Sequence, residues 1–129
     1  MFIDTFFQRV SLLSNKDNLP ISVPKQKSAF PPNYVHSLDS THLMLTAVEC
    51  HKHDIMFAAV HDSFWTHACD IDLMNKLLRE KFVYLHSQPL LENLLADFKA
   101  RHPSIHFDPV PQLGNFDLTK VLTSTYFFA

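Results

Sequence analysis

The chain has 129 residues, 47% of them hydrophobic and 12% aromatic, which is enough to bury the core of one domain and excludes a disordered tail. Its formal charge of −2 at pH 7 excludes the overall basic field of a free-standing nucleic-acid binder, and its single glycine excludes a glycine-rich phosphate loop. The two cysteines, Cys50 and Cys69, are too far apart for a thiolate zinc motif and are interpreted as small buried side chains in a reducing compartment. No apolar run approaches the roughly 20 residues of a membrane span.

The first 32 residues divide into a strand-like segment and a connector. Residues 1–14 are rich in aromatic and β-branched side chains, which predicts a strand or a sheet-edge segment. Residues 15–32 are polar and punctuated by prolines, which predicts an extended connector or a hairpin rather than a helix. We therefore expect the first helix to begin at about Asn33.

Residues 33–53 have helical periodicity, with apolar side chains on more than one side of the helix. A helix of this kind is normally buried inside a larger body. Ser37, Asp39 or Ser40 is the candidate N-cap of its main part. His36 precedes that cap, and a single histidine in this position is typical of a hydrogen-bonded core residue.

Residues 55–68, IMFAAVHDSFWTHA, predict a β-hairpin with an apolar first strand, a corner at His61 and Asp62, and a short aromatic second strand. Two interpretations of Asp62 remain open. Aspartate is common at strand-to-strand corners, so Asp62 can be an ordinary turn residue. Alternatively, its carboxylate is partly desolvated beside apolar neighbours such as Trp65, and it then needs a cation or a hydrogen-bond donor.

The second half of the chain predicts helices. One helix is expected to begin at Asp70, because acidic residues favour the positive end of a helix, and another is expected from Pro89 to Arg101. Arg79 and the two charged residues after it are assigned to the solvent-exposed face. A short helix that Asp117 could cap precedes the aromatic C-terminal residues. The expected inner face of the first of these helices consists of Ile71, Met74, Leu77, Leu78 and Leu85.

Two kinds of metal site are considered, a zinc site built from histidines and a magnesium site at Asp62. Nine histidines suggest a His-rich zinc protein, but their spacing matches neither a zinc finger nor an HExxH helix. Asp62 at a hairpin tip instead suits a hard cation such as Mg²⁺, which binds one or two carboxylates together with waters and phosphate oxygens. Two-metal phosphoryl transfer would need at least a second carboxylate.

Three separate motifs carry a family resemblance. They are AFPPNYVHSLDSTHLMLTA at residues 29–47, FAAVHDSFWTHA at residues 57–68, and the ending GNFDLTKVLTSTYFFA. In this order they closely resemble the C-terminal part of mitochondrial RNA polymerases, which are single-subunit, phage-type DNA-directed RNA polymerases. The resemblance covers residues 25–129.

The resemblance implies an α+β fold, mostly helical with a small antiparallel β-hairpin, that forms the C-terminal palm and fingers portion of a right-hand polymerase. The hairpin would be palm motif C, and Asp62 would be one of two palm aspartates that hold catalytic Mg²⁺ during nucleotidyl transfer. His61 would face the 3′ end of the transcript, and His36 would contact nucleic acid near the active site. The carboxyl end, Phe128 and Ala129, would pack back towards that site.

The same resemblance implies the partners and the setting. These are a DNA template, an RNA transcript, nucleoside triphosphates, mitochondrial transcription factors and a mitochondrial location. The chain is expected to be one partial domain, in which residues 33–69 form the first helix and the hairpin and residues 70–129 form the C-terminal helices and tail.

The sequence also departs from the family pattern. It lacks the first palm aspartate, the fingers helix with its catalytic lysine and tyrosine, and the promoter-binding region. One aspartate cannot build a two-metal site, so we expect the chain not to transcribe alone and to require the upstream part of the polymerase. A non-catalytic interaction module and a His-rich metal-binding protein remain as alternatives.

Overall fold

The computed structural model describes residues 2–4, 9–11 and 20–127. The chain divides into two compact units, Met1–Tyr34 and Val35–Ala129, and each is described by itself. In the first unit, strands β1 (Phe2–Asp4) and β2 (Arg9–Ser11) pair antiparallel, with Ile3 opposite Val10. The prediction of strand structure in the opening segment is confirmed for residues 2–4 and 9–11.

Helix α1 (Val23–Lys52) begins ten residues before the predicted position, Asn33. The prediction of an extended connector or hairpin is therefore wrong for residues 23–32, while residues 12–19 lie outside the described part of the chain. Pro31 and Pro32 lie inside the helix. Proline removes a backbone donor, but its fixed φ of about −65° is itself helical, and here the helix continues through both residues.

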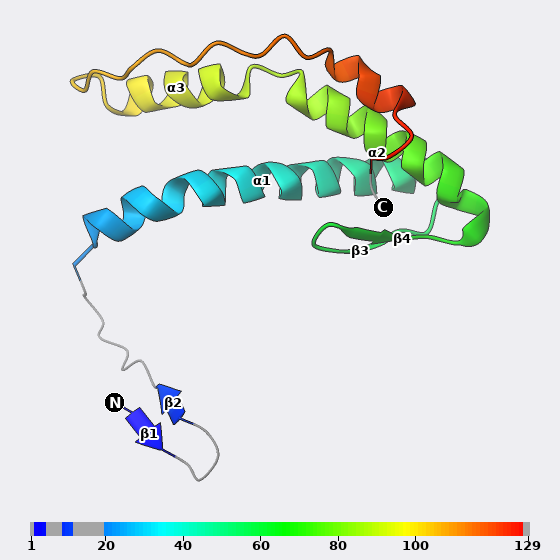
Figure 1. Ribbon diagram of the computed structural model, residues 1–129, viewed down its shortest axis with the longest axis horizontal. Coiled ribbons are helices and arrows are strands. Elements are labelled where there is room, and N and C mark those ends of the chain that lie inside the picture. Colours follow the sequence, from blue (N-terminus) through cyan, green and yellow to red (C-terminus); the bar gives the residue numbers. More distant parts are fainter. Residues whose placement is uncertain (1, 5–8, 12–19, 128–129) are drawn as a thin grey trace. The chain divides into compact units, whose positions relative to one another are not determined.

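The C-terminal half of α1 belongs to the second unit and leads into a β-hairpin (Figure 1). Strands β3 (Ala58–Val60) and β4 (Ser63–Trp65) form this antiparallel pair. A 3-10 turn η1 (Ala68–Asp70) then leads directly into helix α2 (Ile71–His86). The predicted start of this helix is correct to within one residue, although the Asp70 side chain makes no capping hydrogen bond.

The remaining elements are helix α3 (Leu90–Arg101) and the 3-10 helix η2 (Leu118–Thr123). The segment between them returns along α3, and the rings of Phe98 and Phe107 stack with centroids 5.9 Å apart (Figure 1). Asp117 caps η2 as predicted, because its carboxylate accepts a hydrogen bond from the Thr119 backbone N–H at 3.0 Å. The side-chain and backbone hydrogen bonds from Thr119 lower the pKa of Asp117.

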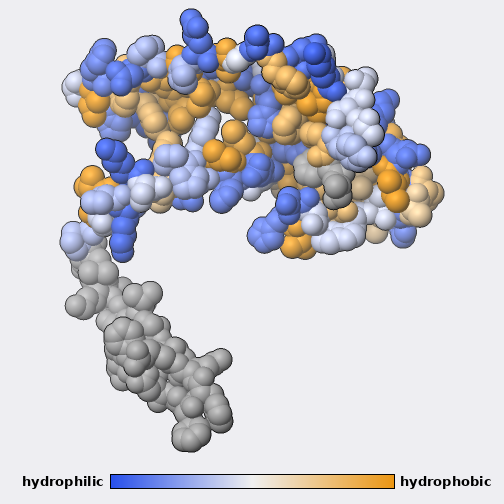
Figure 2. Space-filling model, in the orientation of Figure 1, coloured by the Kyte–Doolittle hydropathy of each residue, from blue (hydrophilic) through white to orange (hydrophobic). Residues whose placement is uncertain are grey.

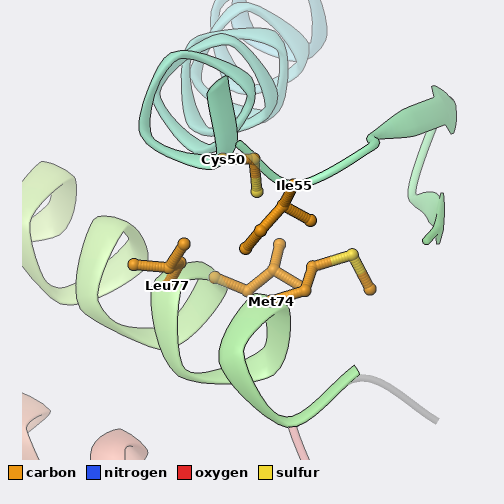
Figure 3. Close-up of a cluster of buried hydrophobic side chains, with 5 residues drawn as sticks. Cys50, Ile55, Met74 and Leu77 are labelled. Carbon is orange, nitrogen blue, oxygen red and sulfur yellow. The ribbon is translucent and has the colours of Figure 1, made fainter. Parts of the chain in front are cut away.

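The core of the second unit lies where the end of α1, the chain leading to β3, and α2 meet (Figure 3). Phe57 and Phe64 of the hairpin pack against this cluster. Full burial of a Leu, Ile or Met side chain contributes about 1.5–3 kcal/mol relative to leaving it exposed. Lys81 on α2 also forms an ion pair with Glu49 on α1, with an N–O distance of 2.9 Å. The buried members of the cluster are Cys50, Ile55, Met74, Leu77 and Leu78.

Two burial predictions need correction. Ile71 was assigned to the inner face of α2 but is 50% exposed, because it begins the helix beyond the core. Cys69 was expected to be buried like Cys50, but it lies in the exposed turn before α2. The other four assigned residues of the inner face, Met74, Leu77, Leu78 and Leu85, are buried as predicted.

Helix α1 buries a narrow stripe that contains two polar side chains instead of a broad apolar face. Its buried side chains are His42, Thr46 and Cys50, four residues apart, whereas Val35 and Val48 are exposed. Figure 2 shows hydrophobic residues at the surface among polar ones on the face that it draws. Other large hydrophobic residues that remain exposed include Met44 on α1 and Ile105, Leu113 and Phe116 in the segment after α3.

The fold class is confirmed as α+β, mostly helical with small antiparallel hairpins. Among the described residues, no helix combines the length and the hydropathy that crossing a bilayer requires.

Candidate active site

The β3–β4 hairpin turns through two residues, His61 and Asp62, because Val60 pairs directly with Ser63. His61 has a φ of 55°, a left-handed conformation that histidine adopts more readily than most non-glycine residues. Such a backbone costs about 1–3 kcal/mol and is common at functional sites. The turn therefore places two adjacent polar side chains at the exposed tip of the hairpin.

The strand pattern holds this tip in place. Ala59 and Phe64 face each other across the hairpin and are half-buried, while their neighbours along each strand are exposed. At the base of the hairpin, the Thr66 hydroxyl donates to the Met56 carbonyl at 2.7 Å. One face of the hairpin is thus attached to the core, and its tip extends beyond it.

Asp62 itself is exposed, so the interpretation of a partly desolvated carboxylate is wrong for this chain. The apolar neighbours that were expected to cover it are exposed as well, with Val60 at 58% and Trp65 at 52%. In a two-residue hairpin these side chains point away from the core side that Phe64 occupies. A cation at Asp62 is therefore not required to offset burial and has to be argued from the surroundings.

Those surroundings are a cleft of about 810 Å³ between the hairpin and α1. The cleft brings together all three residues that the sequence singled out, His36, His61 and Asp62. His36 is exposed to this cleft, so its interpretation as a core histidine is wrong. The remaining residues of its lining are Asp39, Ser40, His42, Leu43 and Phe64.

The contribution of α1 follows from helical spacing. His36, Asp39, Ser40 and Leu43 stand at i, i+3, i+4 and i+7, which places them on one face of the helix. The predicted N-cap at Ser37, Asp39 or Ser40 is wrong, because all three lie inside α1. The Ser40 hydroxyl instead donates to the His36 carbonyl at 3.1 Å.

Sequence reasoning missed two members of the cleft. Asp39 was considered only as a cap, yet it supplies a second carboxylate to the same cleft as Asp62. His42 was not singled out, although its spacing to Thr46 and Cys50 at four-residue steps marks it as part of a buried stripe. Its Nε2 atom lies 2.9 Å from the Leu78 carbonyl of α2.

One titrating group beside the cleft has a shifted pKa. Burial lowers the pKa of His86, the nearby His42 lowers it further, and Asp39 opposes both effects. The His86 ring packs on Phe82, with ring centroids 4.3 Å apart. Burial is the largest of these effects, and it favours the neutral form of the His86 imidazole.

The metal-binding capacity of the cleft is partial. Within the described residues, no group of three or more His, Cys, Asp or Glu side chains is arranged to hold a metal ion. The cleft does contain carboxylate oxygens of Asp39 and Asp62, the ligand type that Mg²⁺ prefers. An ion bound here would take its other ligands from water, phosphate oxygens or residues beyond this chain.

Comparison with known proteins identifies the family of the chain that forms this cleft. A family model described as DNA-dependent RNA polymerase matches residues 1–107, which include the whole hairpin and the cleft face of α1. The chain belongs to this polymerase family. The resemblance to phage-type polymerases recognised in the three motifs is thereby confirmed.

Curated relatives of this polymerase segment are organellar enzymes of plants. The chain is 54% identical over 126 residues to DNA-directed RNA polymerase 3, chloroplastic, of Nicotiana sylvestris, covering 98% of this chain and 13% of the relative. It is 52% identical over 126 residues to DNA-directed RNA polymerase 1, mitochondrial, of Arabidopsis thaliana, with coverage of 98% and 13%.

A third relative, DNA-directed RNA polymerase 1A of Nicotiana tabacum, is 52% identical over 126 residues, covering 98% of this chain and 80% of the relative. The chain thus spans about an eighth of the length of the first two relatives. The palm and fingers assignment of its α+β fold agrees with this family.

Proposed function

We propose that this chain is the C-terminal palm segment of an organellar DNA-directed RNA polymerase, and that its β3–β4 hairpin is the polymerase's motif C. The observation that carries the proposal is the convergence of His36 with the adjacent pair His61 and Asp62 on one cleft, since the histidine and the pair come from two different motifs of the sequence. A family match over residues 1–107 supports the same conclusion.

Asp62 is proposed as one of the two palm aspartates that hold Mg²⁺ for template-directed nucleotidyl transfer. Two carboxylates, Asp39 and Asp62, line the cleft and would repel a phosphate chain unless a cation compensated them. When bound, a pair of Mg²⁺ ions stabilises the attacking and leaving oxygens of an in-line displacement. The contribution of Asp62 is to present carboxylate oxygens at the exposed hairpin tip.

The neighbouring side chains are proposed to position the nucleic acids. His61 precedes Asp62 in the turn and would lie against the 3′ end of the transcript. His36, on the α1 side of the same cleft, would contact nucleic acid near the active site. The proposed packing of Phe128 and Ala129 towards the site concerns residues outside the described part of the chain.

The substrates and partners follow from the same proposal. They are a DNA template, an RNA transcript, nucleoside triphosphates, mitochondrial transcription factors and the upstream part of the polymerase. The relatives are named for mitochondria and for chloroplasts, and we propose a mitochondrial location for this chain. The chain alone is proposed to be inactive, since it supplies only one of the two palm aspartates.

A chimeric enzyme tests the proposal. This chain would replace the matching 126-residue segment of the Arabidopsis thaliana mitochondrial polymerase, and run-off transcription would be measured with and without Asp62→Asn. We expect an active chimera, an inactive isolated chain, and a loss of about 100-fold or more in rate for Asp62→Asn, since a metal carboxylate supplies several kcal/mol and each 1.36 kcal/mol is tenfold. An inactive chimera, or a near-normal rate for Asp62→Asn, would contradict the proposal.

A further inference from the structure

His42 is a buried polar residue that contacts two other elements of the second unit. It lies in α1 with 5% of its surface exposed, and its Nε2 atom is 2.9 Å from the Leu78 carbonyl of α2. A carbonyl oxygen can only accept a hydrogen bond, so Nε2 must carry the hydrogen and donate it. This hydrogen bond joins residues 36 positions apart and sets the direction of the Nε2–H bond of the imidazole ring.

The imidazole ring packs against the hairpin as well as against α2. Its centroid lies 6.4 Å from that of Phe64 at an interplanar angle of 75°, and 5.6 Å from that of Phe82 at 83°. Both are edge-to-face arrangements, the geometry that neighbouring aromatic rings prefer. Phe64 lies on β4 only two residues after Asp62, so the ring contacts the hairpin next to its functional tip.

The neighbouring buried residue, Thr46, provides an informative comparison. Its hydroxyl donates to the His42 carbonyl at 2.9 Å, within the same helix. Thr46 therefore satisfies its own polar group locally, whereas His42 uses its polar group and its ring to connect α1, the hairpin and α2. A purely apolar side chain at position 42 could provide the ring contact but could not donate to α2.

We propose that His42 is a positioning residue that anchors the β3–β4 hairpin to α2 and thereby sets the location of Asp62 in the cleft. The importance of this location for catalysis rests on the function proposed above. The anchoring itself does not, since it follows from contacts among α1, β4 and α2. Because the donor and the ring act together, neither His42→Phe, which keeps a ring, nor His42→Gln, which keeps a donor, should restore the anchoring.

The first experiment measures the hairpin directly in the 129-residue chain. Trp65 is the single tryptophan of the sequence, and it lies on β4 next to Phe64. We expect time-resolved fluorescence anisotropy to show an additional nanosecond motion of Trp65 in both His42→Phe and His42→Gln. Leu85→Ala is the matched control, because Leu85 is buried on α2 outside the cluster that packs against the hairpin.

Two results would overturn the anchoring. One is unchanged Trp65 motion in His42→Phe, which would mean that the hydrogen bond to α2 does not restrain the hairpin. The other is the same additional motion in Leu85→Ala, which would mean that any loss of core packing releases the hairpin. This experiment needs no polymerase activity, so its outcome is independent of the proposed function.

The second experiment measures the catalytic consequence in the chimeric polymerase. We expect His42→Phe to raise the half-saturating Mg²⁺ concentration for run-off transcription about tenfold, with the KM for nucleotides changed less than about twofold, because a displaced ligand weakens metal binding first. Leu85→Ala should lower the melting temperature without changing the Mg²⁺ dependence. An unchanged Mg²⁺ dependence in His42→Phe, in a chimera that Asp62→Asn inactivates, would overturn the positioning role while leaving the proposed function intact.

Discussion

Replacing Arg79 with alanine should detach the C-terminal 3-10 helix η2 from α2. Sequence reasoning assigned Arg79 to the solvent-exposed face, and the structure corrects this, because its guanidinium is partly buried against the C-terminal segment. Nη1 donates to the carbonyls of Val121 at 2.6 Å and Ser124 at 2.7 Å, while Nε donates to Asn75 Oδ1 at 2.6 Å. The guanidinium also lies 5.2 Å from the ring centroid of Phe127.

The magnitude follows from these contacts. A hydrogen bond from a charged donor contributes about 1.5–3 kcal/mol, and the lower end applies here because the site is partly exposed. The two bonds to carbonyls of the C-terminal segment then give about 3 kcal/mol. Since each 1.4 kcal/mol is tenfold, opening of η2 should become roughly 100-fold more frequent in Arg79→Ala. Arg79→Lys keeps the charge but not the planar set of N–H donors, so its frequency of η2 opening should lie between those of the wild type and Arg79→Ala.

Amide hydrogen exchange over residues 118–123, followed by mass spectrometry or NMR, measures this opening. The matched control is Lys76→Ala, three residues earlier on α2, because Lys76 is exposed and its partner Glu80 is 3.9 Å away on the same helix. We expect this control to exchange at the wild-type rate. Unchanged exchange in Arg79→Ala, or equal acceleration in both variants, would refute the role of Arg79 as the contact that holds η2.

Two further predictions concern the core where α1 meets α2. Hydrogen bonds from Lys81 and then Lys52 lower the pKa of Glu49 from 4.5, so the ionised carboxylate stabilises the fold above pH 4.5, and this stabilisation is lost as the pH falls through the lower folded value. Urea unfolding at a series of pH values should therefore show a steeper loss of stability in acid for the wild type than for Glu49→Gln, and parallel curves for the two proteins would contradict this role of Glu49. Burial raises the pKa of the Cys50 thiol, so Ellman's reagent should label only the exposed Cys69 in the native chain, and two thiols that react at similar rates would contradict the burial of Cys50.

The hairpin and the later helices could be predicted because their signals are local. A two-residue polar corner between short strands identifies the turn at His61 and Asp62, and the spacing of Met74, Leu77 and Leu78 identifies the buried face of α2. The start of α1 could not be predicted in this way. Proline is a strong local signal against a helix, and here the helix continues through Pro31 and Pro32.

The contacts that complete the site could not be predicted from local pattern. Arg79 meets backbone carbonyls 42 and 45 positions away, and His42 meets one 36 positions away. Nothing in the immediate sequence identifies such partners, because a charged residue on a helix is usually solvated. Asp39 was missed for a related reason: its helical spacing to His36 is visible, but the hairpin opposite it is a tertiary contact.

The most direct test of the central claim locates the divalent ion itself. Fe²⁺ bound in place of Mg²⁺ generates hydroxyl radicals that cut the nearby backbone, so the chimeric polymerase would be treated with Fe²⁺ and ascorbate and its fragments mapped. We predict cutting within residues 60–64, suppressed by excess Mg²⁺, abolished by Asp62→Asn and retained in Leu85→Ala. Cutting that lies elsewhere in the chain, or that persists unchanged in Asp62→Asn, would contradict the assignment of Asp62 as a metal-binding carboxylate.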